Sequence, residues 1–321
     1  MENWKANYPV DLHSHSNRSD GADTPQELID HAARAGVKIL AITDHDIRPP
    51  MEITLSDGST MDAVSYAASR GLVLIRGIEV SCETTAEDCH IVCLGCDWDD
   101  PWFDYLEKSV VQSKVQSYRE LVRRLAEDGM AITWEEVLDN QGHPVHEDHV
   151  QKKMIFELMG KKGFTKDWSE AKLLVKNTPR YHIDREKPDP LDVIRAAHHT
   201  GGIAIMAHPY LVNEPVTIPA GTMTRAQYID RLIAGGLDGI EACYTYAKTS
   251  YGGSLTPEEI EAEVRERYTN RVQIISGGSD YHADEKKGAK KVRETGECGI
   301  ALEYFMNNAV LRSLLPERMR I

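Results

Sequence analysis

Short apolar runs alternate with amphipathic stretches over roughly the first third of the chain. Successive segments that show the alternation are YPVDLHSH, PQELIDHAARAG, VKILAITDHD, DAVSYAASRG and LVLIRGIEVS. Short apolar runs are typical of buried strands, whereas stretches whose apolar residues recur at helical spacing are typical of helices packed on a sheet. The alternation therefore predicts βα units and a mainly parallel sheet.

The middle of the chain has a different pattern. Charged segments such as SYRELVRRLAEDG and VQKKMIFELMGKKG favour helices there, and no comparable strand pattern occurs. The strand pattern resumes with GGIAIMAHP, GLDGIEACY and RVQIISGGSDYH, with helices expected at 226–234 and 257–268. We therefore predict one α/β domain, formed by residues 8–100 and 195–300, which is interrupted by a helical cap subdomain at 101–194.

Composition favours a folded protein of the cytoplasm. Apolar residues make up 41% of the 321 residues, and the start MENWKANYPV lacks the apolar segment of a signal peptide. No stretch approaches the ~18 apolar residues of a membrane span, so no membrane association is expected. The six cysteines are expected to be reduced thiols. The net charge of −14 argues against stable binding of long nucleic acid, which requires basic surface.

Histidines and acids recur where the predicted strands end. They are Asp11, His13 and His15, then Asp44, His45 and Asp46, then Glu79, His90, His208, Asp280 and His282. A hairpin through CETTAED should return His90 to the side of Glu79. Strand ends of a parallel barrel open onto one face, where such folds build active sites. Any one of these residues could be structural or a helix cap, but their recurrence at successive strand ends favours a metal cluster.

The runs DLHSHSNRSDG, ITDHD, GIEVS, HIVCLG, MAHP and GGSDYHA, in that order, resemble the polymerase and histidinol phosphatase (PHP) family of the amidohydrolase superfamily. The resemblance covers about residues 8–100 and 195–290. It implies a distorted seven-stranded (β/α) barrel of PHP type that binds up to three metal ions. By position it assigns to the first ion His13, His15, Glu79 and Asp280. It assigns to the second ion Glu79, as a bridge, with His90 and His208, and to the third Asp20, His45 and His282.

Asp20 stands where many family members have a third histidine, and this resembles the subgroup of small phosphoesterases that act on nucleotides. An oxygen ligand at this position favours manganese or iron, with zinc still open. Divalent ions that share a carboxylate can lower the pKa of a bridging water, and the resulting hydroxide can attack a phosphate ester. We therefore expect two or three divalent ions and hydrolysis of small phosphorylated nucleotides, such as nucleoside 3′,5′-bisphosphates.

Alternative functions stay open at this point. A 5′-3′ exonuclease on short RNA oligonucleotides ranks second, because the acidic charge argues against long nucleic acid but not against short pieces. Histidinol phosphatase is disfavoured by Asp20 and by the large helical insertion. A non-catalytic metal-binding module is disfavoured by the complete set of expected ligands.

Cationic residues are the candidates for phosphate recognition. Arg18 lies in the loop between expected ligands, and its planar guanidinium suits a phosphate group. We expect Arg18 to act in catalysis together with His208, and to bind substrate together with Lys114 and Arg119. The last two lie on an expected cap helix, where a solvated surface explains them equally well.

Two further patterns are better explained without a metal. An iron–sulfur spacing is formed by Cys89, Cys93 and Cys96. On a strand these thiols diverge, so packing is the better interpretation. A solvated loop around Pro144 explains the histidines His143, His146 and His149.

Overall fold

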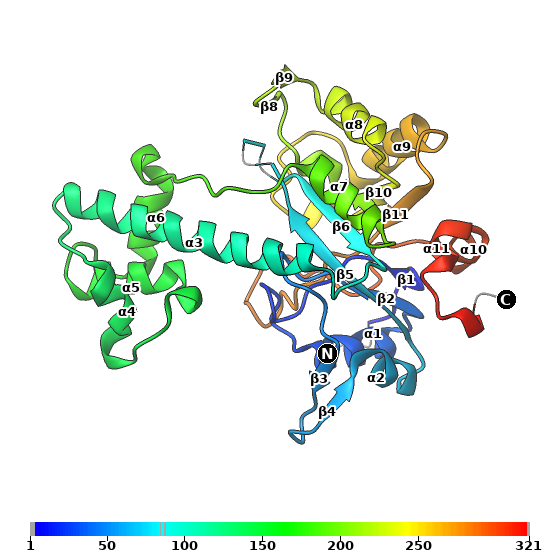
Figure 1. The fold of residues 1–321 in the computed structure, drawn as a ribbon, viewed down its shortest axis with the longest axis horizontal. Coiled ribbons are helices and arrows are strands. Elements are labelled where there is room, and N and C mark those ends of the chain that lie inside the picture. Colours follow the sequence, from blue (N-terminus) through cyan, green and yellow to red (C-terminus); the bar gives the residue numbers. More distant parts are fainter. Residues whose placement is uncertain (1–3, 84, 87, 320–321) are drawn as a thin grey trace. The chain divides into compact units, whose positions relative to one another are not determined.

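The computed structural model describes residues 4–83, 85–86 and 88–319. Thr84 and Glu87, in the expected hairpin, therefore lie outside the described residues. The chain forms two compact units (Figure 1): one contains residues 1–104 and 188–321, and the other contains residues 105–187. The two units are described separately below.

A seven-stranded sheet forms the centre of the first unit. In spatial order its strands are β1 (Val10–Asp11), β2 (Ile39–Ile42), β5 (Val73–Ser81), β6 (His90–Leu94), β7 (Ile203–Met206), β10 (Gly239–Cys243) and β11 (Ile274–Gly277). Neighbouring strands are parallel, except that β6 runs antiparallel to both β5 and β7. The mainly parallel sheet expected from the sequence is therefore present.

The two outer strands of the sheet approach each other. The Leu12 N–H donates to the Gly277 carbonyl oxygen at 3.4 Å, and Ser14 and Tyr281 form an isolated parallel bridge. Gly278 permits this approach, because a Cβ atom there would lie 2.2 Å from the Cβ of His13. The sheet is thus a nearly closed barrel, which confirms the predicted seven-stranded α/β fold.

Helices and two small hairpins surround this sheet. The helices of the first unit are α1 (Pro25–Ala35), α2 (Ala63–Ser69), α7 (Pro190–His199), α8 (Arg225–Ala234), α9 (Pro257–Tyr268), α10 (Leu302–Asn307) and α11 (Ala309–Ser313). Helix α1 begins at a capping box between Thr24 and Glu27 and ends at Gly36, whose φ of 98° suits glycine. The hairpins pair β3 (Glu52–Thr54) with β4 (Thr60–Asp62), and β8 (Val216–Ile218) with β9 (Gly221–Met223).

Both faces of the strands are covered, which explains their continuous apolar runs. In β2, Ile39 and Ala41 pack in a hydrophobic cluster formed mainly by residues of the strands, here called the interior cluster. Leu40 and Ile42 pack in a second cluster, which contains residues of α1 and α2. Phe305 of α10 belongs to the interior cluster. No helix in the described part of the chain is long and apolar enough to cross a membrane.

The second unit is helical and has its own core. Helix α3 (Pro101–Glu127) enters it from the first unit, and it also contains α4 (Trp134–Asp139), α5 (Lys152–Lys161) and α6 (Trp168–Asn177). Leu125, Ile155 and Met159 are fully buried in one hydrophobic cluster there. The role of residues 101–194 as a cap stays a prediction.

Truncation of one leucine tests whether this cluster stabilises the second unit. Leu125→Ala should lower the free energy of unfolding by about 2–5 kcal/mol, because it leaves a cavity in a packed core. Leu173 is a matched control, since its side chain is 57% exposed in the same unit, and Leu173→Ala should change this free energy by only about 0.5 kcal/mol. Urea denaturation followed by circular dichroism measures both, and equal losses would contradict the assigned core.

Candidate metal centre

The predicted ligands meet at one end of the barrel. His13 and His15 follow β1, His45 follows β2, Glu79 lies in β5, His90 begins β6, His208 follows β7, and Asp280 and His282 follow β11. The pairing of Ser81 with His90 brings the start of β6 next to the end of β5, as the hairpin predicted. Asp20 reaches the same region from the loop that follows His15.

The Glu79 carboxylate lies at the centre of this cluster. Its Oε2 lies within 3.2 Å of a ring nitrogen of each of three histidines, His13, His15 and His45. Its Oε1 lies 2.9 Å from a ring nitrogen of each of two others, His90 and His208. The two oxygens thus face two different groups of imidazoles, which is the arrangement expected of a carboxylate shared between two ions.

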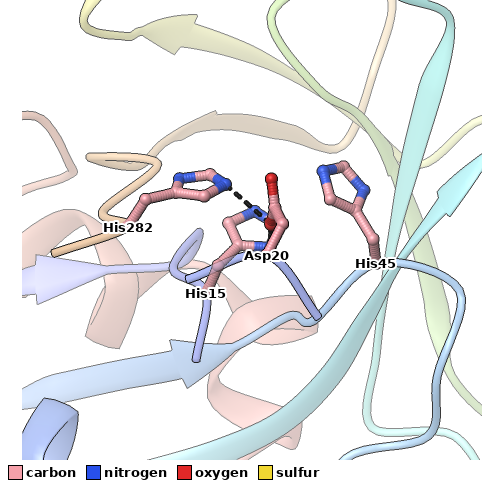
Figure 2. A group of neighbouring side chains, drawn as sticks. All are labelled: His15, Asp20, His45 and His282. Carbon is pink, nitrogen blue, oxygen red and sulfur yellow. Dashed lines mark ion pairs between the residues drawn. The ribbon is translucent and has the colours of Figure 1, made fainter. Parts of the chain in front are cut away.

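Three overlapping groups of side chains bring their ligand atoms close enough to hold a cation. The first is His13, His15, Glu79 and Asp280; the second contains His45, Glu79 and His90; the third is His15, Asp20, His45 and His282. The first has the composition expected for the first ion, whereas the second contains His45 in place of the expected His208. The third adds His15 to the expected set, and Figure 2 shows its four side chains turned toward one another, with Asp20 Oδ1 3.0 Å from His282 Nε2.

Buried ring nitrogens that make no hydrogen bond show that the cluster fits metal ions. Both nitrogens of His15, Nε2 of His13 and Nδ1 of His45 are buried and make no hydrogen bond among the described residues, although three of these atoms lie 3.1–3.2 Å from Glu79 Oε2. Buried polar atoms normally find partners, and leaving them without one is costly. Imidazole nitrogens mixed with carboxylate oxygens form a donor set that suits divalent ions such as manganese, iron and zinc.

Charge pairing in the cluster shifts its ionisation. Burial alone would raise the pKa of the Glu79 carboxyl, but the imidazoles of His13, His45 and His90 hold this pKa well below its ordinary value. Burial would lower the pKa of His13, but Glu79, Glu241 and Asp280 raise it well above its ordinary value. The Glu79 carboxylate is therefore ionised, as metal binding requires, whereas the His13 imidazole must lose a proton when an ion binds.

Asp280 is held in one orientation by two residues that were not among the predicted ligands. Its Oδ1 lies 3.1 Å from His15 Nε2. Its Oδ2 accepts hydrogen bonds from the Tyr244 hydroxyl and from the Arg293 guanidinium, both at 2.6 Å. The position of Tyr244 beyond an expected strand was visible in the sequence, whereas no pattern around Arg293 indicated a role.

Some strand-end acids support the site without joining the candidate groups. They are Asp11, Asp44 and Asp46. The Asp11 carboxylate accepts hydrogen bonds from the backbone of Ser279 and Gly296, and Asp44 accepts from both the N–H and the hydroxyl of Ser16. These acids therefore hold the loops that carry the ligands.

The three cationic residues expected to bind phosphate make hydrogen bonds or ion pairs with other residues of the protein. The exposed Arg18 donates to the Arg48 carbonyl oxygen at 2.5 Å and does not line the cavity described below. In the second unit, Arg119 pairs with Glu147 at 2.5 Å, and Lys114 donates to the Asp148 carbonyl oxygen at 2.7 Å. Within the described residues, no candidate metal group contains a cysteine or any of His143, His146 and His149.

A cavity of about 290 Å³ adjoins the cluster. Most of the predicted ligands line it, and so do three cationic residues, Lys248, Lys287 and Arg293. Lys248 donates to the Val292 carbonyl oxygen at 2.6 Å, and Arg293 pairs with Asp280. Lys287 is exposed, and its ammonium has no hydrogen bond or ion pair within the described part of the chain. The cavity thus combines candidate metal ligands with cationic side chains.

The sequence profile of the PHP domain matches residues 11–183, which is more than half of the chain. The chain belongs to the PHP domain family. A 3′,5′-nucleoside bisphosphate phosphatase of Chromobacterium violaceum is 28% identical over 287 residues, which cover 87% of this chain and 89% of that protein. A 5′-3′ exoribonuclease of Haemophilus influenzae is 29% identical over 232 residues, which cover 72% and 77% of the two chains.

A solved structure shares the fold of this PHP-family chain. It is a protein from Bifidobacterium adolescentis that aligns with a TM-score of 0.64 and 24% identity, over 96% of this chain and 97% of that one. This likeness concerns the fold, and it confirms the barrel of PHP type.

Replacement of the central carboxylate tests the shared-ligand arrangement. Glu79→Gln should remove more bound metal than His90→Ala, because the amide weakens two ion sites at once and removes the charge that balances them. Elemental analysis of purified protein, before and after addition of Mn²⁺, measures the difference. The exposed Glu52 offers a control, and Glu52→Gln should retain the wild-type metal content. Less than one equivalent in the wild type, without gain on adding metal, would contradict the site.

Proposed function

We propose that this chain is a metal-dependent phosphoesterase that hydrolyses phosphate esters of small nucleotides, with nucleoside 3′,5′-bisphosphates as the leading substrates. The observation that carries the proposal is the Glu79 carboxylate shared between two groups of imidazoles, beside a small cavity with cationic residues. The hydrolase class expected from the sequence agrees with the PHP family and with relatives that bear phosphatase and exoribonuclease names.

The predicted ligands would hold the ions that carry out the chemistry. Bound divalent ions supply Lewis acidity and a water of lowered pKa. His13, His15, Glu79 and Asp280 would hold the first ion, and Glu79, His90 and His208 the second. In the proposed third group, Asp20 is the most exposed ligand, with its side chain 56% exposed, so this site lies nearest to solvent. The oxygen ligand favours manganese or iron there, with zinc less suited.

The cationic residues of the cavity would bind and orient the substrate. A phosphate ester carries negative charge, and the chain as a whole carries a net charge of −14, so recognition needs local cations. Lys287 is the best placed of these residues, because Lys248 and Arg293 already make hydrogen bonds within the protein. A second phosphate on the substrate would gain from a cation beside the metal cluster. This favours bisphosphates over monoesters.

A substrate panel tests the proposed function. Manganese-loaded protein should release phosphate from adenosine 3′,5′-bisphosphate with a kcat/KM about tenfold or more above that for adenosine 5′-monophosphate. A chelator should abolish the activity, and Mn²⁺ should restore it. Faster cleavage of a short 5′-phosphorylated RNA would favour the exoribonuclease alternative. No turnover of any phosphate ester by metal-loaded protein would refute the proposal.

Comparison of two cationic residues tests where the phosphate binds. Lys287→Ala should lower kcat/KM for the bisphosphate by about tenfold or more, because it removes a charge that lines the cavity. Arg18→Ala should have a smaller effect, since the Arg18 guanidinium donates to the Arg48 carbonyl. Steady-state kinetics at saturating Mn²⁺ measures both variants. The opposite ranking would return phosphate recognition to Arg18, as the sequence suggested.

A further inference from the structure

Strand β10 contributes none of the nine predicted ligands, although every other strand of the barrel carries at least one at or near its end. It lies between β7 and β11, whose ends carry His208, Asp280 and His282. In place of a ligand, β10 carries the buried Glu241, and Tyr244 follows directly after the strand. The contacts of these two side chains show what the strand contributes.

The Glu241 carboxylate joins two predicted ligands that are expected to hold different ions. It is only 2% exposed, and its Oε1 lies 3.3 Å from Nδ1 of His13. Its Oε2 accepts a hydrogen bond from the backbone N–H of His208 at 2.7 Å. When an ion is bound, a carboxylate at Nδ1 would keep the imidazole proton there and leave Nε2 available to the ion. The Nε2 atom of His13 is the one that faces Glu79, at 3.1 Å.

The same carboxylate stabilises an unfavourable backbone conformation. His208 has a φ of 26°, in the region that residues with a Cβ atom rarely adopt. Its N–H donates to the Glu241 carboxyl group at 2.7 Å, and this contact holds the backbone in that conformation. Glu241 therefore determines where the His208 ring lies, with Nε2 2.9 Å from Glu79 Oε1.

Tyr244 acts on a third predicted ligand, Asp280, which follows the neighbouring strand β11. Its hydroxyl donates to Oδ2 of Asp280 at 2.6 Å, alongside Arg293. With that oxygen occupied, Oδ1 remains to face His15 Nε2 at 3.1 Å. The strand thus orients ligands that follow β1, β7 and β11.

We propose that Glu241 and Tyr244 are positioning residues that set the spacing of the first two ion sites, with Glu241 as the main one. The proposal rests on the proposed function only in requiring that the cluster binds metal. It makes no assumption about the substrate. Neither residue is a metal ligand in this arrangement.

The variant Glu241→Gln tests the proposal. The two donors face different oxygens of Glu241, the His13 Nδ1–H facing Oε1 and the His208 N–H facing Oε2. Glutamine has an acceptor oxygen at only one of these two positions, so it cannot accept from both. If the oxygen accepts from His208, the NH₂ group faces Nδ1 of His13 and favours the tautomer with a proton on Nε2. Mn²⁺ affinity, measured by competition with a chelator, should fall about 10–100-fold. The Mn²⁺ concentration for half-maximal activity should rise, while KM for the bisphosphate stays within about twofold.

The opposite end of the same strand offers a matched control. Asp238 directly precedes β10, is 6% exposed, and likewise joins a histidine to a backbone N–H. It pairs with His198 Nε2 at 2.8 Å and accepts from the Ala204 N–H at 2.8 Å. Neither partner is a predicted ligand. Asp238→Asn should therefore lower the melting temperature but leave Mn²⁺ content and affinity unchanged.

The outcomes separate this proposal from the proposed function. Wild-type Mn²⁺ affinity and content in a folded Glu241→Gln variant would overturn it, and so would equal losses of affinity in Glu241→Gln and Asp238→Asn. If Glu241→Gln does not fold, Tyr244→Phe decides, because it removes a single hydroxyl: a weakened Mn²⁺ affinity supports the proposal, and an unchanged one overturns it. A wild-type protein that binds no Mn²⁺ would instead refute the proposed function.

Discussion

The buried Glu79 carboxylate is the interaction on which the rest of the site depends. An ionised group in a protein interior is costly unless opposite charges or hydrogen-bond donors surround it. Here, imidazoles from four other segments of the chain converge on its two oxygens. The carboxylate and the imidazoles therefore stabilise one another, and divalent ions between them would satisfy both. The position of Glu79 within β5, near the middle of the strand order, makes this convergence possible.

The barrel brings these segments together through its strand order and its near closure. Reversal of β6 places His90 beside Glu79, and the approach of β1 and β11 brings His13 and His15 to Asp280 and His282, which are far away in the sequence. Two ligands, His208 and Asp280, have left-handed backbone conformations with φ of 26° and 52°. Such strain persists only where the surrounding contacts determine the conformation, and it is common at functional sites.

A layer of acids behind the ligands supports this arrangement. Asp11 and Asp44 hold loop backbones, whereas Glu241 contacts the ligands themselves. The acidity of the chain is therefore partly structural, and it does not conflict with a phosphorylated substrate. Positive charge is placed locally by side chains such as Lys287 at the cavity, and the ions that the cluster is suited to hold would add to it. A few positive charges at the cavity are enough for a small phosphorylated substrate, even though the net charge of the chain is −14.

The sequence by itself predicted an α/β fold with histidines and acids gathered in one cluster, and its resemblance to the PHP family implied the type of barrel and the ligand set, Asp20 included. Strand periodicity placed histidines and acids at successive strand ends, and the topology of a parallel barrel then requires those ends to meet. Only the tertiary structure decided which side chains act behind the ligands and beside the cavity. Arg18 lies among the ligands in sequence, yet its guanidinium donates to the Arg48 carbonyl, whereas Arg293 reaches Asp280 from a segment without a recognisable pattern. The partners of side chains such as Arg18 and Arg293 depend on which segments the fold brings close together. The local sequence does not show which segments these are.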